Sequence, residues 1–295
     1  TVLKKFGTMS FGDVSETAIK YAREGFTVHP TMANFLEHYK ENYRKWPSNA
    51  EIWLRNGQPL KEGDLLIQKD LAKSIQFMVD EEKRASKHSR ERGLNAARDA
   101  FYRGDIAKKI IDFHKINGGL LSREDLAEYT TPLEDPLSIK FMNTDIYSCG
   151  AWCQGPTLLQ MLRILEGMNL ENLRHNSTEY LHTLTETIKL VFADREAFYG
   201  DPNIIEVPIK QLLSTEFAEK RKTMIDMRKA WTSLPPAGII PGFGRPPYEA
   251  CVDKSDTIAA PDTSYTCAID KTGNVCSITP SDVSFDSPVI PDLGF

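Results

Sequence analysis

The chain has 295 residues, of which 41% are hydrophobic and 26% charged, a composition that is ordinary for a globular protein and argues against disorder. Its net charge of −5 lacks the basic excess that a general nucleic-acid binder usually shows, so we expect no nucleic-acid partner. No apolar run approaches the roughly 18–20 residues that cross a bilayer, so we expect no membrane span. The chain starts at Thr1 and stops in a turn-rich apolar stretch, and we therefore expect it to be part of a longer protein.

The cysteines and histidines predict neither a disulfide framework nor a metal site. There are five cysteines, an odd number at low density, and Cys149 and Cys153 lack the C-x-x-C spacing of redox pairs. Cys267 and Cys276 lie in apolar, strand-like stretches, which predicts that they are buried. None of the six histidines forms an H-E-x-x-H motif, so no zinc or other metal cofactor is expected.

The sequence of the first half of the chain predicts helices. Residues 8–24 form a capped helix, in which Ser10 and Asp13 have the spacing of a capping box and Gly25 ends the apolar stripe. Residues 69–114 are also helical but contain a polar patch, 81–92, in which eight of twelve residues are charged. This patch is typical of a solvated helix face or loop, and a nucleic-acid contact is the alternative.

Further elements follow in the middle of the chain. Residues 118–129 predict a loop and a short helix capped by Ser122 and Asp125. Residues 137–149 alternate as a strand does, with three inward candidates: Ile139, Phe141 and Ile146. Residues 155–167 predict a helix with one apolar face formed by Leu158, Leu162 and Leu165, and residues 177–199 predict another helix.

The amino-acid composition of the last part of the chain differs from that of the preceding part. Residues 231–262 are rich in proline and glycine, which predicts an exposed, mobile loop. Two β-rich runs follow, 265–270 and 275–279, and the turn sequence 271–274 between them predicts a β-hairpin. Thr263 thus stands where the loop meets the hairpin.

A threonine at this junction can serve as a nucleophile. Its hydroxyl is a weak nucleophile unless a base lies beside it. If the Asp262–Thr263 peptide bond were broken, Thr263 would gain an α-amine with a pKa of about 7.7–8.0, which could accept the hydroxyl proton. The alternative is that Thr263 is only a strand residue, because threonine is common in strands.

The residues around the junction resemble the γ-glutamyltransferase family. Residues 262–279 are similar to the family's Thr-Thr-His/Tyr start and its Val-Val-Asp-x-x-Gly-Asn hairpin. Four earlier segments also match family elements in order: 6–26, 118–129, 155–167 and 193–202. The family consists of proenzymes of the N-terminal nucleophile hydrolase class, which cleave themselves into a large and a small subunit.

The resemblance implies a fold and a domain organisation. The fold is α+β, the αββα four-layer sandwich of these hydrolases, here mainly the helical large-subunit part plus the first small-subunit hairpin. Residues 1–262 would be the C-terminal part of the large subunit, with 231–262 as a flexible processing loop, and 263–295 would begin the small subunit. The partner would be the remainder of the same proenzyme. Family members also carry an earlier substrate-binding arginine and a later glycine pair that forms the oxyanion hole.

The resemblance also implies site residues. Thr263 would be the nucleophile, and Asp262–Thr263 the processing site. Ser281 and Asp282 stand where the family has Thr-x-Asn, and together with Tyr265 they would contact the substrate. The Ser281 hydroxyl could hydrogen-bond Thr263, and the Asp282 carboxylate would favour a cationic group such as an α-ammonium. A plain turn residue is the alternative for Asp282.

Together these features predict an enzyme that hydrolyses small amides without a cofactor. The expected reaction is cleavage of γ-glutamyl or other small acyl amides through an acyl-enzyme on Thr263. One alternative is a transferase that acts on glutathione with amino-acid or peptide acceptors, and another is an uncleaved, non-catalytic binding module. Asp194 and Arg195 are expected to form a structural ion pair or cap, and Trp152 is a candidate pocket residue.

Overall fold

The computed structural model describes residues 1–243, 263–281, 285 and 287–295. The chain divides into two compact units, the first formed by Thr1–Thr131 with Asp256–Phe295 and the second by Pro132–Ser255. Each unit has its own buried apolar clusters.

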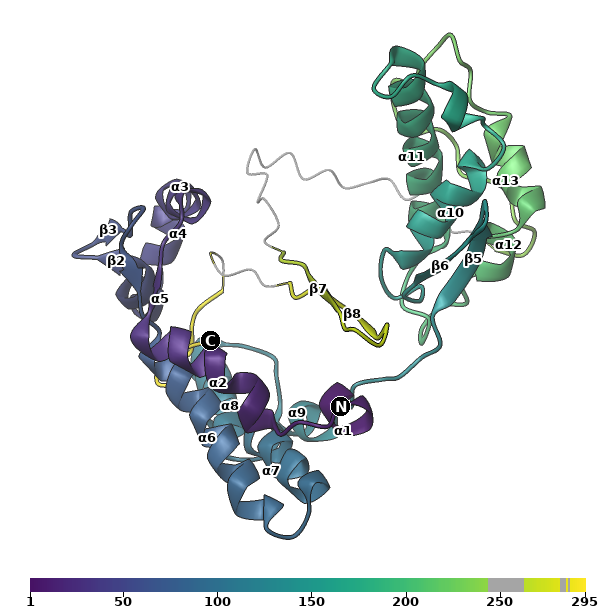
Figure 1. Cartoon of the computed structure of the whole chain (residues 1–295). Coiled ribbons are helices and arrows are strands. Elements are labelled where there is room, and N and C mark those ends of the chain that lie inside the picture. The colour runs from purple at the N-terminus through teal and green to yellow at the C-terminus, as the bar shows by residue number, and fades with distance from the viewer. Residues whose placement is uncertain (244–262, 282–284, 286) are drawn as a thin grey trace. The chain divides into compact units, whose positions relative to one another are not determined.

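The first unit is mainly helical (Figure 1), and α2 and α7 both pack against α6. Its helices are α1 (Val2–Phe6), α2 (Phe11–Glu24), α3 (Pro30–His38), α4 (Lys40–Arg44), α5 (Pro47–Trp53), α6 (Lys69–Ser86), α7 (Arg90–Tyr102), α8 (Asp105–Asn117) and α9 (Arg123–Glu128). Its strands form antiparallel pairs: β1 (Phe26–Thr27) with β4 (Leu65–Leu66), β2 (Leu54–Arg55) with β3 (Gln58–Pro59), and β7 (Thr266–Ile269) with β8 (Val275–Ile278).

The predicted helix caps are present. The Ser10 hydroxyl accepts the Asp13 N–H at 3.0 Å, and the Asp13 carboxylate accepts the Ser10 N–H at 3.0 Å. Ser122 and Asp125 make the same reciprocal pair at the start of α9. Gly25 ends α2 with a φ of 91°, a conformation that glycine adopts without the steric cost of a Cβ.

Residues 81–92 were predicted to form a solvated face, and Glu82 does not follow this prediction. Its side chain is buried, and its carboxylate accepts the N–H groups of Phe11 at 2.6 Å and Gly12 at 2.8 Å. The first N–H groups of a helix have no partner within the helix, and a negative charge there is favourable. One charged residue of the patch therefore caps α2 from α6, because the antiparallel packing of helices brings it there. The rest of the patch spans the turn between α6 and α7.

The tail of the first unit is held by buried polar side chains of distant helices. The Asn49 side chain donates to the Ser287 carbonyl at 2.8 Å and accepts the Val289 N–H at 2.7 Å. The Ser74 hydroxyl donates to the Leu293 carbonyl at 2.8 Å. Both side chains are buried, so residues 287–293 are fixed against α5 and α6.

The second unit combines a hairpin with helices. Its elements are β5 (Leu137–Phe141), β6 (Thr144–Ser148), α10 (Gly155–Leu165), the 3₁₀ helix η1 (Leu170–Asn172), α11 (Thr178–Phe198), α12 (Ile209–Leu212) and α13 (Thr215–Lys222). The single strand predicted over 137–149 is wrong, because β5 and β6 pair as an antiparallel hairpin with Ile139 opposite Ile146. Its turn consists of Met142, at a φ of 54°, and Asn143; it contains no glycine, so Asn143 was its one turn signal.

The apolar face predicted for α10 is only partly correct. Leu159 and Ile164 are fully buried and Leu165 is buried, whereas Leu158 is exposed. The helix packs against α11, α13 and the β5–β6 hairpin, so neighbours on several sides decide which stripe is covered. A single helical period could not show this.

Asp194 is the centre of a buried polar network in this unit. It forms an ion pair with Arg221 and accepts hydrogen bonds from Gln160 at 2.6 Å and from the Gly238 N–H at 2.7 Å. The structural ion pair expected for Asp194 is thus present, but with Arg221. Arg195 instead pairs with the neighbouring Glu196.

Two buried charged side chains, Glu186 of α11 and Arg221 of α13, bind the backbone of segment 231–240. The Glu186 carboxylate accepts the Trp231 N–H at 3.1 Å, and Arg221 donates to the Pro236 carbonyl at 2.9 Å. Ile240 is buried in an apolar cluster of the unit. Residues 231–240 form no helix or strand, as predicted for the loop 231–262, and several of them are exposed, whereas Pro235 and Ile240 are buried and buried charges bind the backbone of the segment. Residues 244–262 lie outside the described residues.

Candidate active site

The strands β7 and β8 form the hairpin that the sequence predicts around residues 271–274. Thr266 pairs with Ile278, and Ile269 with Val275. Within the turn, the Asp270 carboxylate accepts the N–H groups of Thr272 at 2.8 Å and Asn274 at 2.9 Å, as well as both side chains. The side-chain hydrogen bonds from Asn274 and Thr272 lower the pKa of Asp270 to about 2.

Thr263 and Ser281 extend this hairpin beyond the named strands. They form an antiparallel bridge in the register that Thr266 and Ile278 set, and the Ser264 N–H donates to the Pro280 carbonyl at 3.0 Å. The Thr263 and Ser281 hydroxyl oxygens lie 3.1 Å apart, within hydrogen-bond distance. The contact expected between these two hydroxyls is present, and it arises because directly opposed side chains of paired strands share one face.

Tyr265 lies two residues further on, and its hydroxyl accepts a hydrogen bond from Ser277 at 3.2 Å. Residues two apart point to the same side of a strand, so Thr263, Tyr265 and Ser281 present their hydroxyls on one face. All three side chains are exposed. The other two candidate positions, Asp262 and Asp282, lie outside the described residues.

The two hairpin cysteines are exposed, so the prediction that they are buried is wrong. Both faces of β7 and β8 are exposed in the described part of the chain. An apolar, alternating strand is typical of a covered sheet, but covering needs a packing partner that no pattern within the strand identifies. Cys267 pairs with Ser277 and Ala268 with Cys276, so the two thiols point to opposite faces.

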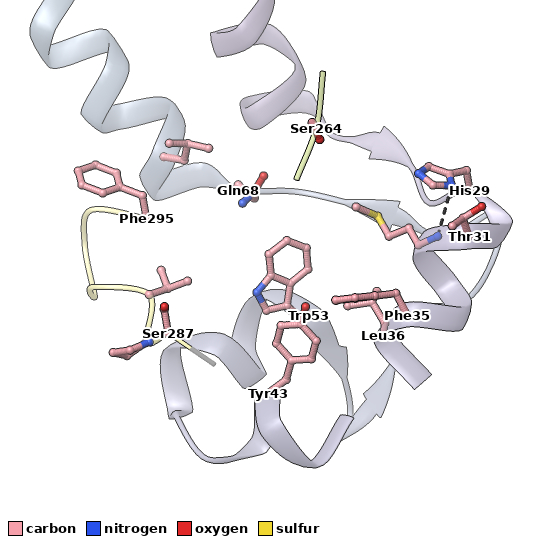
Figure 2. Close-up of a pocket in the computed structure, with 15 residues that line it drawn as sticks. His29, Thr31, Phe35, Leu36, Tyr43, Trp53, Gln68, Ser264, Ser287 and Phe295 are labelled. Atoms are coloured by element: carbon pink, nitrogen blue, oxygen red, sulfur yellow. Dashed lines mark hydrogen bonds between the residues drawn. The ribbon is translucent and has the colours of Figure 1, made fainter. Parts of the chain in front are cut away.

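A cavity of about 560 Å³ adjoins this strand at Ser264. Figure 2 shows Trp53 and Tyr43 on its floor and Gln68 across from them. Met32, Phe35 and Leu36 of the lining have the i, i+3, i+4 spacing of an amphipathic helix face, but the lining comes from segments far apart in the sequence, so the cavity itself could not be predicted. The position of Ser264 next to Thr263 was the only available signal.

The second unit contains the other candidate contact, Trp152. Its indole N–H donates to Glu134, and its side chain is exposed. The thiol of Cys153 lies nearby, and burial raises its pKa, which disfavours the reactive thiolate. Among the described residues, no group of three or more His, Cys, Asp or Glu side chains could hold a metal ion, and no helix there is long and apolar enough to cross a membrane.

The fold of the chain matches one class of known structures. The chain has the fold of the N-terminal nucleophile hydrolases, the αββα four-layer sandwich, to which the described part contributes mainly helices and the β7–β8 hairpin. More specifically, the chain belongs to the gamma-glutamyltranspeptidase family, whose family model matches residues 1–295.

Relatives with assigned names support this membership. The chain is 32% identical to the glutathione hydrolase proenzyme of Bacillus subtilis (strain 168) over 99% of its length and 48% of the relative's. It is 30% identical to the acylase ACY 1 proenzyme of Pseudomonas sp. (strain SE83) over 94% of its length and 44% of the relative's. The crystal structure of Helicobacter pylori gamma-glutamyltranspeptidase matches with a TM-score of 0.70 and 27% identity over 80% of this chain and 64% of that one. The chain spans about half the length of the curated relatives it matches.

Proposed function

We propose that the protein containing this chain cleaves itself before Thr263 and then hydrolyses small amides through the Thr263 hydroxyl. The observation that carries the proposal is the 3.1 Å contact between the Thr263 and Ser281 hydroxyls at the exposed start of a paired strand. Because hydrogen bonds to the paired strand fix the backbone on one side, Thr263 at the end of the strand is held in a defined orientation. Ser281 can then orient the nucleophile by donating to or accepting from its oxygen.

The first stage is self-cleavage. The Thr263 oxygen attacks the carbonyl carbon of Asp262, the peptide C–N bond breaks, and the hydroxyl proton passes to the departing nitrogen. An ester then joins the two residues, and the α-amine of Thr263 is free. Water then hydrolyses the ester and leaves the Asp262 carboxylate and the Thr263 hydroxyl. Residues 1–262 would end the large subunit, and 263 would begin the small subunit.

The second stage uses the new amine. The α-amine of Thr263 accepts the hydroxyl proton as the Thr263 oxygen attacks the substrate carbonyl carbon. The proton then passes to the amine that leaves the substrate. The resulting acyl ester is hydrolysed by water, which restores the hydroxyl and releases the acid. The residues in these steps need no metal or organic cofactor.

The proposed substrates are γ-glutamyl or other small acyl amides. The names glutathione hydrolase and acylase among the relatives support hydrolysis of an amide of this size. Tyr265 is a candidate substrate contact on the Thr263 face, and Asp282 would add a negative charge that favours an α-ammonium group. The remainder of the same proenzyme is the proposed partner.

The test is the intact mass and N-terminal sequence of every piece of the purified full-length protein. We expect a polypeptide that begins Thr-Ser-Tyr-Thr, no such piece from Thr263→Ala, and slower cleavage in Thr263→Ser, which keeps a hydroxyl. Thr266→Ala is the matched control within the same strand and should cleave normally. Normal cleavage of Thr263→Ala would exclude the mechanism. An uncut wild-type protein would favour a binding module, and a rate that rises with added dipeptide would favour a transferase.

A further inference from the structure

The cavity beside Ser264 has the composition of a binding site for an uncharged molecule. Its volume of about 560 Å³ is within the range of small-molecule sites. The described residues that line it include aromatic and aliphatic side chains, and none of these described residues is Asp, Glu, Lys or Arg. A buried charge without a partner costs several kcal/mol, so this lining disfavours a charged group and favours an apolar or aromatic one.

A histidine, His29, lies at the rim of the cavity. His29 lies at the N-terminus of α3, where its Nδ1 accepts the Met32 N–H at 3.3 Å. The His29 side chain therefore caps α3 and also lines the cavity.

One polar atom in the cavity wall lacks a partner. The indole N–H of Trp53 is buried, and no described residue accepts a hydrogen bond from it. Figure 2 shows the indole standing among the lining residues, with its nitrogen turned toward the side where Gln68 and Ser287 lie. Leaving a buried donor unsatisfied costs about 1–3 kcal/mol, and an acceptor on a bound molecule would remove that cost.

We propose that this cavity binds an uncharged aromatic or apolar molecule that carries a carbonyl acceptor for the Trp53 N–H. The cavity touches Ser264, whose side chain points to the face of the strand opposite to that of Thr263. The ligand could be the apolar part of the amide substrate, which would extend from Thr263 past the end of the strand into the cavity. It could also be a separate small molecule. Both have the same chemistry, and binding itself does not depend on Thr263 acting as a nucleophile.

The test uses phenylacetamide as the probe, because it is neutral, aromatic and has one carbonyl. We would titrate it by calorimetry into the full-length protein and into Thr263→Ala, and expect saturable binding to both. Trp53→Phe keeps an aromatic ring but removes the N–H and should weaken binding about two- to tenfold. Trp46→Phe, a tryptophan outside the lining, is the matched control.

Two further arms test charge and place. Phenylacetate, which adds a charge to the same ring, should bind at least tenfold more weakly. Thr31→Trp, which fills the exposed rim, should abolish binding while Thr31→Ala does not. The absence of saturable binding to the folded wild type, or binding that ignores both Trp53→Phe and Thr31→Trp, would overturn the proposal.

The last arm identifies the source of the ligand. Competitive inhibition of γ-glutamyl anilide hydrolysis by phenylacetamide would show that the cavity holds part of the substrate. Binding without inhibition would support the site as one for a separate molecule. If Thr263→Ala binds the probe but wild type neither cleaves itself nor turns over substrate, the proposed function fails and the binding site stands.

Discussion

The Nε atom of Arg221 on α13 lies 3.0 Å from Oδ2 of Asp194 on α11, and both side chains are buried. Burial raises the pKa of Asp194 above its ordinary value, against the opposing effect of the arginine. A buried charge pair is tolerated when further hydrogen bonds complete it, and here Gln160 and Gly238 do so. The stability of the Asp194–Arg221 ion pair therefore depends on the hydrogen bonds from Gln160 and Gly238.

Asp194→Ala should unfold the second unit readily. The change leaves the Arg221 guanidinium buried without its counter-charge, which typically costs about 3–5 kcal/mol. Urea unfolding would measure the loss. Glu219→Ala removes the exposed partner of Lys222 on the same helix and should change stability by less than about 0.5 kcal/mol. Equal effects of the two changes would contradict this account.

Asn49→Ala should release the tail of the first unit. The variant loses both hydrogen bonds to the backbone of Ser287 and Val289 and leaves those groups unsatisfied, at a cost of about 1–3 kcal/mol. Limited proteolysis would detect faster cleavage within 285–295. Asn42→Ala on the neighbouring α4 has no such contact and serves as the control. Unchanged protection of the tail would show that Phe285 and Leu293 hold it by themselves.

Ser281→Ala should slow self-cleavage and turnover without unfolding the hairpin. The change removes the only described hydroxyl within hydrogen-bond distance of the Thr263 oxygen, and losing one such polar contact at a reacting group would cost about ten- to a hundredfold in rate. Ser281→Thr should restore most of the rate. Ser277→Ala removes a hydroxyl of the same face that bonds Tyr265 instead, and it should have a smaller effect. A wild-type rate in Ser281→Ala would exclude a positioning role.

Acid should loosen the β7–β8 turn only at low pH. The pKa of Asp270 is about 2 in the folded chain, against an ordinary value of 3.8. Since the folded value is the lower one, the stabilisation is fully present above about pH 4 and is lost as the pH falls toward 2. Amide exchange of the hairpin across this range would follow the loss. Asp270→Asn should abolish the pH dependence, whereas Lys271→Ala should preserve it.

Local signals in the sequence predicted the capped helices and the hairpin well. Ser10 with Asp13, and Asp270 with Asn274, are each a few residues apart, so the hydrogen bonds that fix them can be inferred from spacing. The proximity of Thr263 to Ser281 followed from the hairpin and the resemblance together. Their chemical roles remain predictions.

Contacts between distant residues could not be predicted in the same way. Glu82 caps a helix about seventy residues earlier, and Asn49 holds a segment near the end of the chain. The cavity beside Ser264 combines residues from α3, α5 and the tail, which lie far apart in the sequence. Such features arise from the packing of whole elements, which a pattern within one element does not encode.

The register of the β7–β8 hairpin places a constraint on related sequences. Thr263 and Ser281 face each other because the turn at 271–274 sets which residues are opposed. A single residue inserted into either strand would shift that pairing by one and turn one of the two hydroxyls to the other face, while an insertion looped out of the turn would leave it intact. When sequences of this kind are aligned, the parity of the strand lengths between these two positions should therefore separate members that keep the hydroxyl pair from members that have lost it, even where the residues themselves are unchanged.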